Sequence, residues 1–314
     1  MPPDKLSARG DPEMTPKITR RYIDGGYGQV HLRQAGAMGP KPALLCLHMS
    51  PMSGRIYGAL LAEMGRDRFV VAPDTPGFGM SDAPSSPPEI ADYAAAMSEV
   101  IEALELDGPV DVLGYHTGAM TAPELAILRP DRIRRVVMVA APIYTAEERE
   151  AARRQYTRPE PRPDGRHLLD PWIGLTHWNL HSGATIDDVA DEFPEMIAGR
   201  ALAGWGHRAA FNHRLEDRLP LVTQPVLVLN PQDDIWDKTP RAAACLRYGW
   251  IVDLPGWGHG FQTRRAADTA ALLRSFLDAP DDAPFDALQI PEDALVKRTL
   301  PTQANRPVSP DQEI

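Results

Sequence analysis

The 314-residue sequence has few cysteines, no long hydrophobic run and no excess of basic residues. Its two cysteines, Cys46 and Cys245, lie in separate apolar segments, so we expect reduced core thiols and no disulfide framework. No apolar run approaches the roughly 20 residues that a membrane-spanning helix needs. The net charge of −10 disfavours nucleic acid and anionic membrane surfaces as partners. Residues 1–17 also lack the basic-then-apolar order of a secretory signal. These absences predict a cytoplasmic protein that binds neither membrane nor nucleic acid. They leave the oligomeric state open, a homo-oligomer included.

Apolar strand-like runs alternate with helical patterns through the first half of the chain. An opening hairpin is predicted from 18–23 and 29–33, with helices and buried strands following in turn. This alternation indicates a parallel sheet covered by helices on both faces. The expected strands are 43–47, 68–74, 110–115 and 135–140, and the pattern resumes with 225–230, 250–254 and a closing helix at 264–277.

The remaining segments divide the chain into four parts. Residues 1–16 are predicted to form an N-terminal tail, and residues 17–142 and 220–278 the α/β core. Residues 143–219 contain helical patterns and no buried strand, which favours a helical cap inserted into the core. Residues 279–314 are rich in proline and aspartate with little periodicity, so we expect an extended or disordered C-terminal tail.

The most informative stretch is 109–120, where a β-branched strand ends in Gly114-Tyr115-His116-Thr117-Gly118. Two glycines around one exposed position are typical of a nucleophile elbow, a sharp turn from strand to helix. The glycines are needed because the turn is strained and the two backbones pass close together. The usual pattern has serine at the middle position, whereas this chain has His116. We therefore expect strained backbone angles at His116.

Four motifs in order resemble the α/β-hydrolase fold superfamily, in its capped small-molecule branch. They are the His48 loop, the segment 74–82 (close to the family's D-x-P-G-x-G-x-S), the elbow, and two loops that carry an acid and a histidine. The resemblance covers residues 18–277. It implies an α/β class fold with a mostly parallel eight-stranded sheet, flanked by helices and bearing a helical cap.

The resemblance also implies a variant of a catalytic triad. The family's acid position falls on Asp234, with Asp233 as the alternative because the register rests on one residue. The histidine is His259, which has glycine on both sides. In such a site the acid fixes the tautomer of the imidazole and stabilises its charged form. We expect the imidazole of His116 to lie within hydrogen-bond or one-water reach of His259, and therefore the two rings to lie within about 8 Å of each other.

An oxyanion site is implied as well. One donor is the backbone N–H of Thr117 at a helix N-terminus, and the other comes from Ser50, or from Met49 if the register slips. Met49 stands where the family usually has glycine. His48 is more consistent with a structural role, bonding backbone groups in that loop.

His116 has three interpretations. As a nucleophile it would form an acyl-imidazole from an ester or lactone. As an acid or base it would work with His259 in a lyase or a cofactor-independent oxygenase. In the third interpretation the protein only binds a ligand. Metal binding by His116, His259 and Asp234 has ligand types that suit zinc or iron, but no close spacing supports it. We expect no metal and no cofactor.

The predicted cap offers hints about the substrate. Aromatic and histidine residues concentrate between 172 and 213, which favours either an aromatic pocket wall or packing between cap helices. Arginines between 149 and 166 interleave with glutamates, which is typical of a solvated helix face; one arginine turned inward would imply a substrate carboxylate. The sequence thus predicts a hydrolase of a small ester, lactone or C–C bond, centred on His116, Asp234 and His259.

Overall fold

The computed structural model describes residues 15–106, 108–156, 160–282, 285 and 287–299. Its centre is one sheet with the strand order β1-β2-β4-β3-β5-β6-β7-β8-β9. The strands are β1 (Thr19–Gly25), β2 (Gly28–Ala35), β3 (Ala43–Leu47), β4 (Val70–Pro73), β5 (Val110–Tyr115), β6 (Ile133–Val139), β7 (Val226–Pro231), β8 (Gly249–Leu254) and β9 (Leu295–Thr299). The pairings from β4 through β3, β5, β6 and β7 to β8 are all parallel. The mostly parallel α/β sheet expected from the sequence is therefore present.

The sheet edges are antiparallel. Strand β1 pairs with β2 as the predicted hairpin, and β2 pairs antiparallel with β4. At the other edge β9 pairs antiparallel with β8 and adds a ninth strand to the eight expected. Strand β9 comes from the segment predicted as an extended or disordered tail. Residues 1–14 and 300–314 of the two predicted tails lie outside the described residues.

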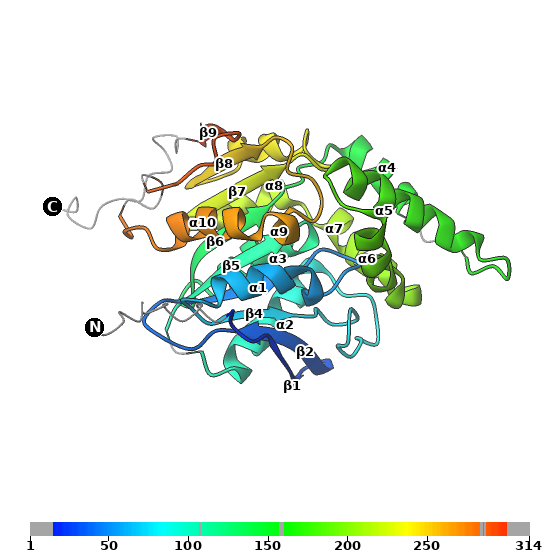
Figure 1. Cartoon of the computed structure of the whole chain (residues 1–314), viewed down its shortest axis with the longest axis horizontal. Helices are drawn as coiled ribbons and strands as arrows, with labels where there is room; N and C mark the ends of the chain where they lie inside the picture. The colour runs from blue at the N-terminus through cyan, green and yellow to red at the C-terminus, as the bar shows by residue number, and fades with distance from the viewer. Residues whose placement is uncertain (1–14, 107, 157–159, 283–284, 286, 300–314) are drawn as a thin grey trace, which may run out of the picture.

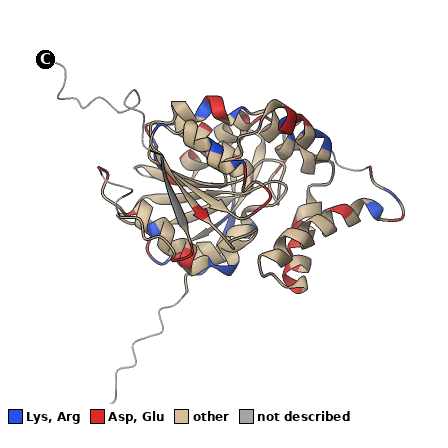
Figure 2. Ribbon diagram, turned by 90° about the horizontal axis from the view of Figure 1, so that it is seen from above, with Lys and Arg blue, Asp and Glu red and all other residues tan. Residues whose placement is uncertain are grey.

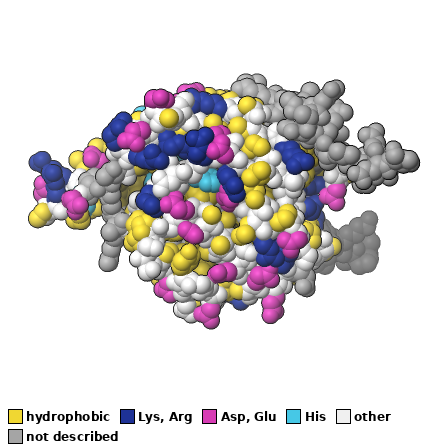
Figure 3. All heavy atoms as spheres, turned by 180° about the vertical axis from the view of Figure 1, so that it is seen from behind, with side chains coloured by type: hydrophobic (Ala, Val, Ile, Leu, Met, Phe, Trp, Pro, Cys, Tyr) yellow, Lys and Arg dark blue, Asp and Glu magenta, His cyan; other side chains and the backbone are white. Residues whose placement is uncertain are grey.

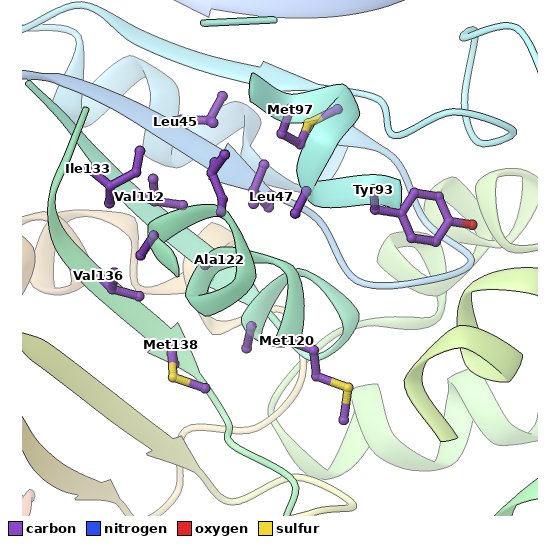
Figure 4. Close-up of a cluster of buried hydrophobic side chains, with 14 of the residues drawn as sticks. Leu45, Leu47, Tyr93, Met97, Val112, Met120, Ala122, Ile133, Val136 and Met138 are labelled. Carbon is purple, nitrogen blue, oxygen red and sulfur yellow. The ribbon is translucent and has the colours of Figure 1, made fainter. Parts of the chain in front are cut away.

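Helices cover both faces of the sheet. On one face α2 (Ile90–Ala103) and α3 (Thr117–Leu128) pack on the central strands, as Figure 4 shows for Tyr93, Met97 and Met120 beside Leu45, Val112 and Val136. The other face is covered by η1 (Gly54–Tyr57), α1 (Gly58–Met64), α9 (Phe261–Arg264) and α10 (Ala266–Leu277). All residues of β3, β4 and β5 are buried, as expected for strands covered on two sides.

A helical insertion, residues 146–221, separates β6 from β7. Figures 1 and 2 show most of its helices beyond one end of the sheet. It contains α4 (Ala146–Gln155), η2 (Arg166–Leu168), α5 (Leu169–His181), α6 (Ile186–Ala198), η3 (Arg200–Gly204), α7 (Trp205–Asn212), α8 (Leu215–Arg218) and η4 (Leu219–Leu221). Outside the insertion, a further short helix, η5 (Thr239–Ala244), lies between β7 and β8. Helices α4 and α6 begin with capping boxes at Thr145 and Thr185, which satisfy the first backbone N–H groups.

The described surface mixes both signs of charge. In Figure 3, Lys and Arg side chains lie beside Asp and Glu side chains over the face shown. In the part of the chain that the structure describes, no helix combines the length and apolar character that crossing a membrane requires.

Candidate active site

His116 lies on a strained turn between β5 and α3. Its φ of 47° and ψ of −104° fall in a region that residues other than glycine rarely adopt. A Cβ on Gly118 would lie 2.1 Å from the carbonyl oxygen of Leu47, and one on Gly114 would lie 2.1 Å from that of Gly118. Neither glycine can therefore carry a side chain without moving the backbone. The prediction of a strained elbow at His116 is confirmed.

The two aspartates after β7 each face a different histidine. The Nε2 atom of His116 lies 2.8 Å from Oδ2 of Asp233, and Nε2 of His259 lies 3.0 Å from Oδ1 of Asp234. His116 Nε2 is also 3.9 Å from Oδ1 of Asp234. The sequence motif predicts one acid, Asp234, with Asp233 as the alternative. The structure brings both acids to the site, where each pairs with one imidazole.

The two imidazoles are close neighbours. The ring centroids of His116 and His259 lie 5.4 Å apart, with the planes at 76° to each other. The prediction that these rings lie within about 8 Å is confirmed. His116 follows the carboxyl end of β5, Asp233 and Asp234 follow β7, and His259 follows β8. Because parallel strands end at the same edge, three separate loops meet at one point.

Several neighbours hold these groups in place. The backbone N–H of Ile235 donates to Oδ1 of Asp233 at 3.0 Å, and the Tyr156 hydroxyl donates to Oδ2 of Asp234 at 3.2 Å. The Tyr115 hydroxyl lies 3.5 Å from Nδ1 of His259. The sequence analysis gave Tyr115 and Tyr156 no role. No local pattern marks them, because Tyr115 reads as a strand residue and Tyr156 as a helix end.

Burial and charge act in opposite directions on the site. Burial alone would lower the pKa of His116, but the charge of Asp233, its hydrogen bond and the charge of Asp234 outweigh this effect and raise the pKa. Burial opposes the charged form of Asp234, yet the hydrogen bond with His259 and the charge of His116 hold the pKa of that carboxyl well below its usual range. The site therefore favours a protonated imidazole beside an ionised carboxylate.

The loop after β3 provides the residues predicted for oxyanion binding. Met49 and Ser50 line the same cavity as His116. His48 is buried behind them: its Nδ1 lies 2.9 Å from the carbonyl oxygen of Met49, and its Nε2 accepts the backbone N–H of Thr75 at 2.9 Å. His48 thus bonds backbone groups, as expected. Thr117 is the first residue of α3, directly after His116. The roles of Ser50, Met49 and Thr117 as oxyanion donors remain predictions.

A cavity of about 520 Å³ opens onto these groups. His116, Asp234 and His259 line it from the sheet side. The helical insertion contributes apolar and aromatic side chains, including Leu175 and Trp178 of α5. A volume of this size fits a small organic molecule.

The aromatic and histidine residues of the insertion divide into two groups. Trp178 and His207 line the cavity, whereas Trp172 packs against Phe193, with ring centroids 5.2 Å apart. Burial, with a contribution from the charge of His116, lowers the pKa of His207 to about 4, so this wall residue is neutral at neutral pH. Both interpretations of the aromatic stretch therefore apply, to different residues.

The described arginines of the insertion do not line the cavity. Arg149 is buried, but it donates to the carbonyl oxygens of Tyr144 and His213 and to Glu216. Among the described residues, no Lys or Arg lines the cavity. The described walls therefore offer no lysine or arginine to pair with a substrate carboxylate.

Comparisons with known proteins agree with this fold. Residues 42–231 match the family model described as alpha/beta hydrolase fold. Haloalkane dehalogenase 2 of Mycobacterium tuberculosis is 35% identical over 130 residues, which cover 41% of this chain and 43% of the dehalogenase. The match thus spans less than half of that relative's length. A non-heme chloroperoxidase of Burkholderia pyrrocinia is 28% identical over 271 residues, covering 77% of this chain and 94% of the relative.

A solved structure gives the same result for the fold alone. The crystal structure of the enol-lactonase from Burkholderia xenovorans LB400 superposes with a TM-score of 0.69 at 20% identity, covering 82% of this chain and all of that one. Because the family model matches more than half of the sequence, this chain belongs to the α/β-hydrolase fold family.

Proposed function

We propose that this protein hydrolyses an ester, lactone or C–C bond of a small molecule, with His116, Asp234 and His259 at its centre. The observation that carries the proposal is the convergence of two histidine–carboxylate pairs on one cavity, at 2.8 and 3.0 Å. A carboxylate that orients an imidazole is the base half of a hydrolytic triad. The similarity to named hydrolases supports the same class of reaction.

His116 replaces serine at the elbow, so the attacking group differs from the family pattern. In the neutral ring, with the Nε2–H group donating to Asp233, Nδ1 holds the lone pair that could attack the substrate or accept a proton; the protonated ring could only donate one. Water activated by an imidazole is the other nucleophile that this geometry permits. In both routes negative charge develops on the substrate oxygen. The backbone N–H of Thr117 and the loop of Met49 and Ser50 would stabilise that charge.

The helical insertion would act as the cap that determines substrate choice. Leu175 and Trp178 give the cavity an apolar wall, and the described lining contains no lysine or arginine. These features favour substrates whose acyl or alcohol part is uncharged. We therefore choose neutral esters and lactones as probes.

A second reaction class is favoured by one observation. Each imidazole has its own carboxylate, so the two rings form two acid/base pairs 5.4 Å apart. A lyase or cofactor-independent oxygenase that removes one proton and delivers another would use such a pair of groups. In that case the elbow histidine acts without acylation.

The test is sustained turnover of p-nitrophenyl acetate, p-nitrophenyl butyrate and dihydrocoumarin by purified protein. We expect steady hydrolysis above the buffer rate by the wild type, and a loss of at least about 100-fold in His259→Ala. His181→Ala is the matched control, because His181 lies on α5 and contacts His177 instead of the site. No turnover of any of these probes by the wild type would overturn the hydrolase proposal and favour the lyase or the ligand-binding interpretation.

A further inference from the structure

Four potential metal-ligand atoms converge at the floor of the cavity. One atom each from His116, Asp233, Asp234 and His259 lies within 4.8 Å of all the others. The individual separations include 2.8, 3.0 and 3.9 Å. Zinc bonds to nitrogen and oxygen of about 2.0–2.1 Å place neighbouring tetrahedral ligand atoms roughly 3.3 Å apart. The observed separations, from 2.8 Å up to a limit of 4.8 Å, lie on both sides of this value. An ion would therefore have to draw the most distant ligand atoms together by about an ångström or more, while the hydrogen-bonded pairs spread by a few tenths.

The atoms that face away from this point are held by the protein. Oδ1 of Asp233 accepts from the N–H of Ile235, and Oδ2 of Asp234 accepts from the Tyr156 hydroxyl. Nδ1 of His259 lies 3.5 Å from the Tyr115 hydroxyl. Such outer contacts fix the direction of ligand atoms in metal sites. The inner atoms are therefore preoriented toward a common centre.

The partners of these carboxylates differ from those of Asp111 and Glu124, although buried Asp74 also faces one imidazole, that of His31 at 2.8 Å. Buried Asp111 pairs with Arg134 at 2.7 Å, and Glu124 pairs with Arg218. Asp233 and Asp234 instead face imidazoles, which are themselves metal ligands when neutral. Two imidazoles with two carboxylates form a mixed nitrogen and oxygen set that suits zinc and other divalent transition metals.

We propose that His116, Asp233, Asp234 and His259 bind one divalent transition-metal ion, with Zn²⁺ as the representative case. Metal binding does not depend on the proposed function. A role for the metal in hydrolysis does rest on the proposed function. Four protein ligands fill a tetrahedral site, so a water molecule would have to occupy a fifth position on the cavity side, where the ion would polarise it. That water would be the nucleophile, in place of the serine that the elbow lacks.

Zinc binding by metal-stripped protein tests the proposal directly. We would titrate Zn²⁺ alone against the protein in competition with a chromophoric chelator, and follow the shift in melting temperature in parallel. We expect one ion per chain, a higher melting temperature with zinc, and at least about 10-fold weaker binding in Asp233→Asn and in His116→Ala. Circular dichroism of each variant shows that it is folded.

His177 and His181 require a control because they lie one helical turn apart on α5, with ring centroids at 4.6 Å. His181→Ala removes this surface pair and should keep the wild-type affinity. The proposal is overturned if the wild type binds no zinc, if both site variants bind as tightly as the wild type, or if the loss appears in His181→Ala.

Ester turnover by stripped and zinc-loaded protein separates the two proposals. Turnover without any zinc binding removes the metal site and leaves the hydrolase. Zinc binding that depends on the four residues, without turnover in either form, supports the metal site and removes the hydrolase.

Discussion

The parallel strands begin at one side of the sheet, here the amino edge, and end at the other, the carboxyl edge. Both contain acidic groups, but the partners of these groups differ. At the amino edge the partners are arginines: Asp111 lies 2.7 Å from Arg134, and Arg68 contacts Asp278. At the carboxyl edge Asp233 and Asp234 face His116 and His259. Arginine keeps its proton at every pH of interest, whereas histidine exchanges one near neutrality. The amino edge therefore holds fixed charges that support the fold, and the carboxyl edge holds groups that can change state.

This comparison predicts opposite effects of substitutions at the two edges. A change at the carboxyl edge should reduce activity and leave stability nearly unchanged. A change at the amino edge should reduce stability and leave the activity of the folded protein unchanged.

The largest effect is expected for Asp234→Asn. The amide cannot stabilise a positively charged His259 as the carboxylate does, so kcat/KM for the best ester should fall by roughly 10²–10⁴. The melting temperature should fall only modestly, because the lost pairing of the ionised carboxylate with His259 and His116 is partly offset by relief of the repulsion from adjacent Asp233. Steady-state kinetics and thermal denaturation measure the two effects. A large loss of stability with unchanged kcat/KM would contradict the comparison.

Arg135→Met should have the opposite pattern. The buried guanidinium of Arg135 donates to the carbonyl oxygens of Phe276, Ala279 and Pro280, where α10 ends. Methionine fills the volume but donates nothing, so the free energy of unfolding should fall by about 2–3 kcal/mol. Urea denaturation gives this value, with the exposed Arg21→Met as the control. Activity per folded molecule should equal that of the wild type, and a 10-fold drop in it would refute the separation of roles.

The smallest effect concerns Asp67 at the amino edge, and it depends on pH. Burial opposes its ionisation, but hydrogen bonds from Arg274 and Lys41 outweigh this and lower its pKa to about 2. The unfolded value is about 3.9, so the stabilising contribution is complete above about pH 4 and is lost as the pH falls toward 2. Asp67→Asn should cost about 1 kcal/mol or less at pH 7, because water screens this half-exposed network.

The measurement is the urea midpoint of Asp67→Asn and wild type at pH 7 and at pH 3. The difference between them should shrink at pH 3. Asp268→Asn is the control, because its contact with Arg265 is long, at 3.9 Å, and open to water. A cost that grows on acidification would contradict the sign of the pKa shift.

The sequence predicted the features that have local signals. Apolar runs marked the strands of the core, and Gly114 and Gly118 marked the elbow, because a turn this close tolerates no Cβ. Strand β9 was not predicted as a strand. It joins the sheet edge through backbone pairing with β8, and backbone pairing at an edge leaves little trace in the sequence.

The site residues were also predicted only in part, and the reason differs from the one that applies to β9. The family pattern contains one acid, so the sequence analysis chose between Asp233 and Asp234. With histidine at the elbow there are two imidazoles, and each takes one carboxylate. The four residues come from three loops, so no spacing in the sequence indicates that their ligand atoms lie within 4.8 Å. Only the register of β5, β7 and β8 brings them together.

The most direct test of the account is kcat/KM of His116→Ala and His116→Ser on the best neutral ester, measured beside the wild type. Both the imidazole and the metal-binding route need His116, so His116→Ala should lose at least about 100-fold in kcat/KM while remaining folded. His116→Ser restores the family's usual nucleophile beside the pair of Asp234 and His259, and should retain more esterase activity than His116→Ala. Wild-type activity in His116→Ala would contradict the central claim and would assign the chemistry to another residue.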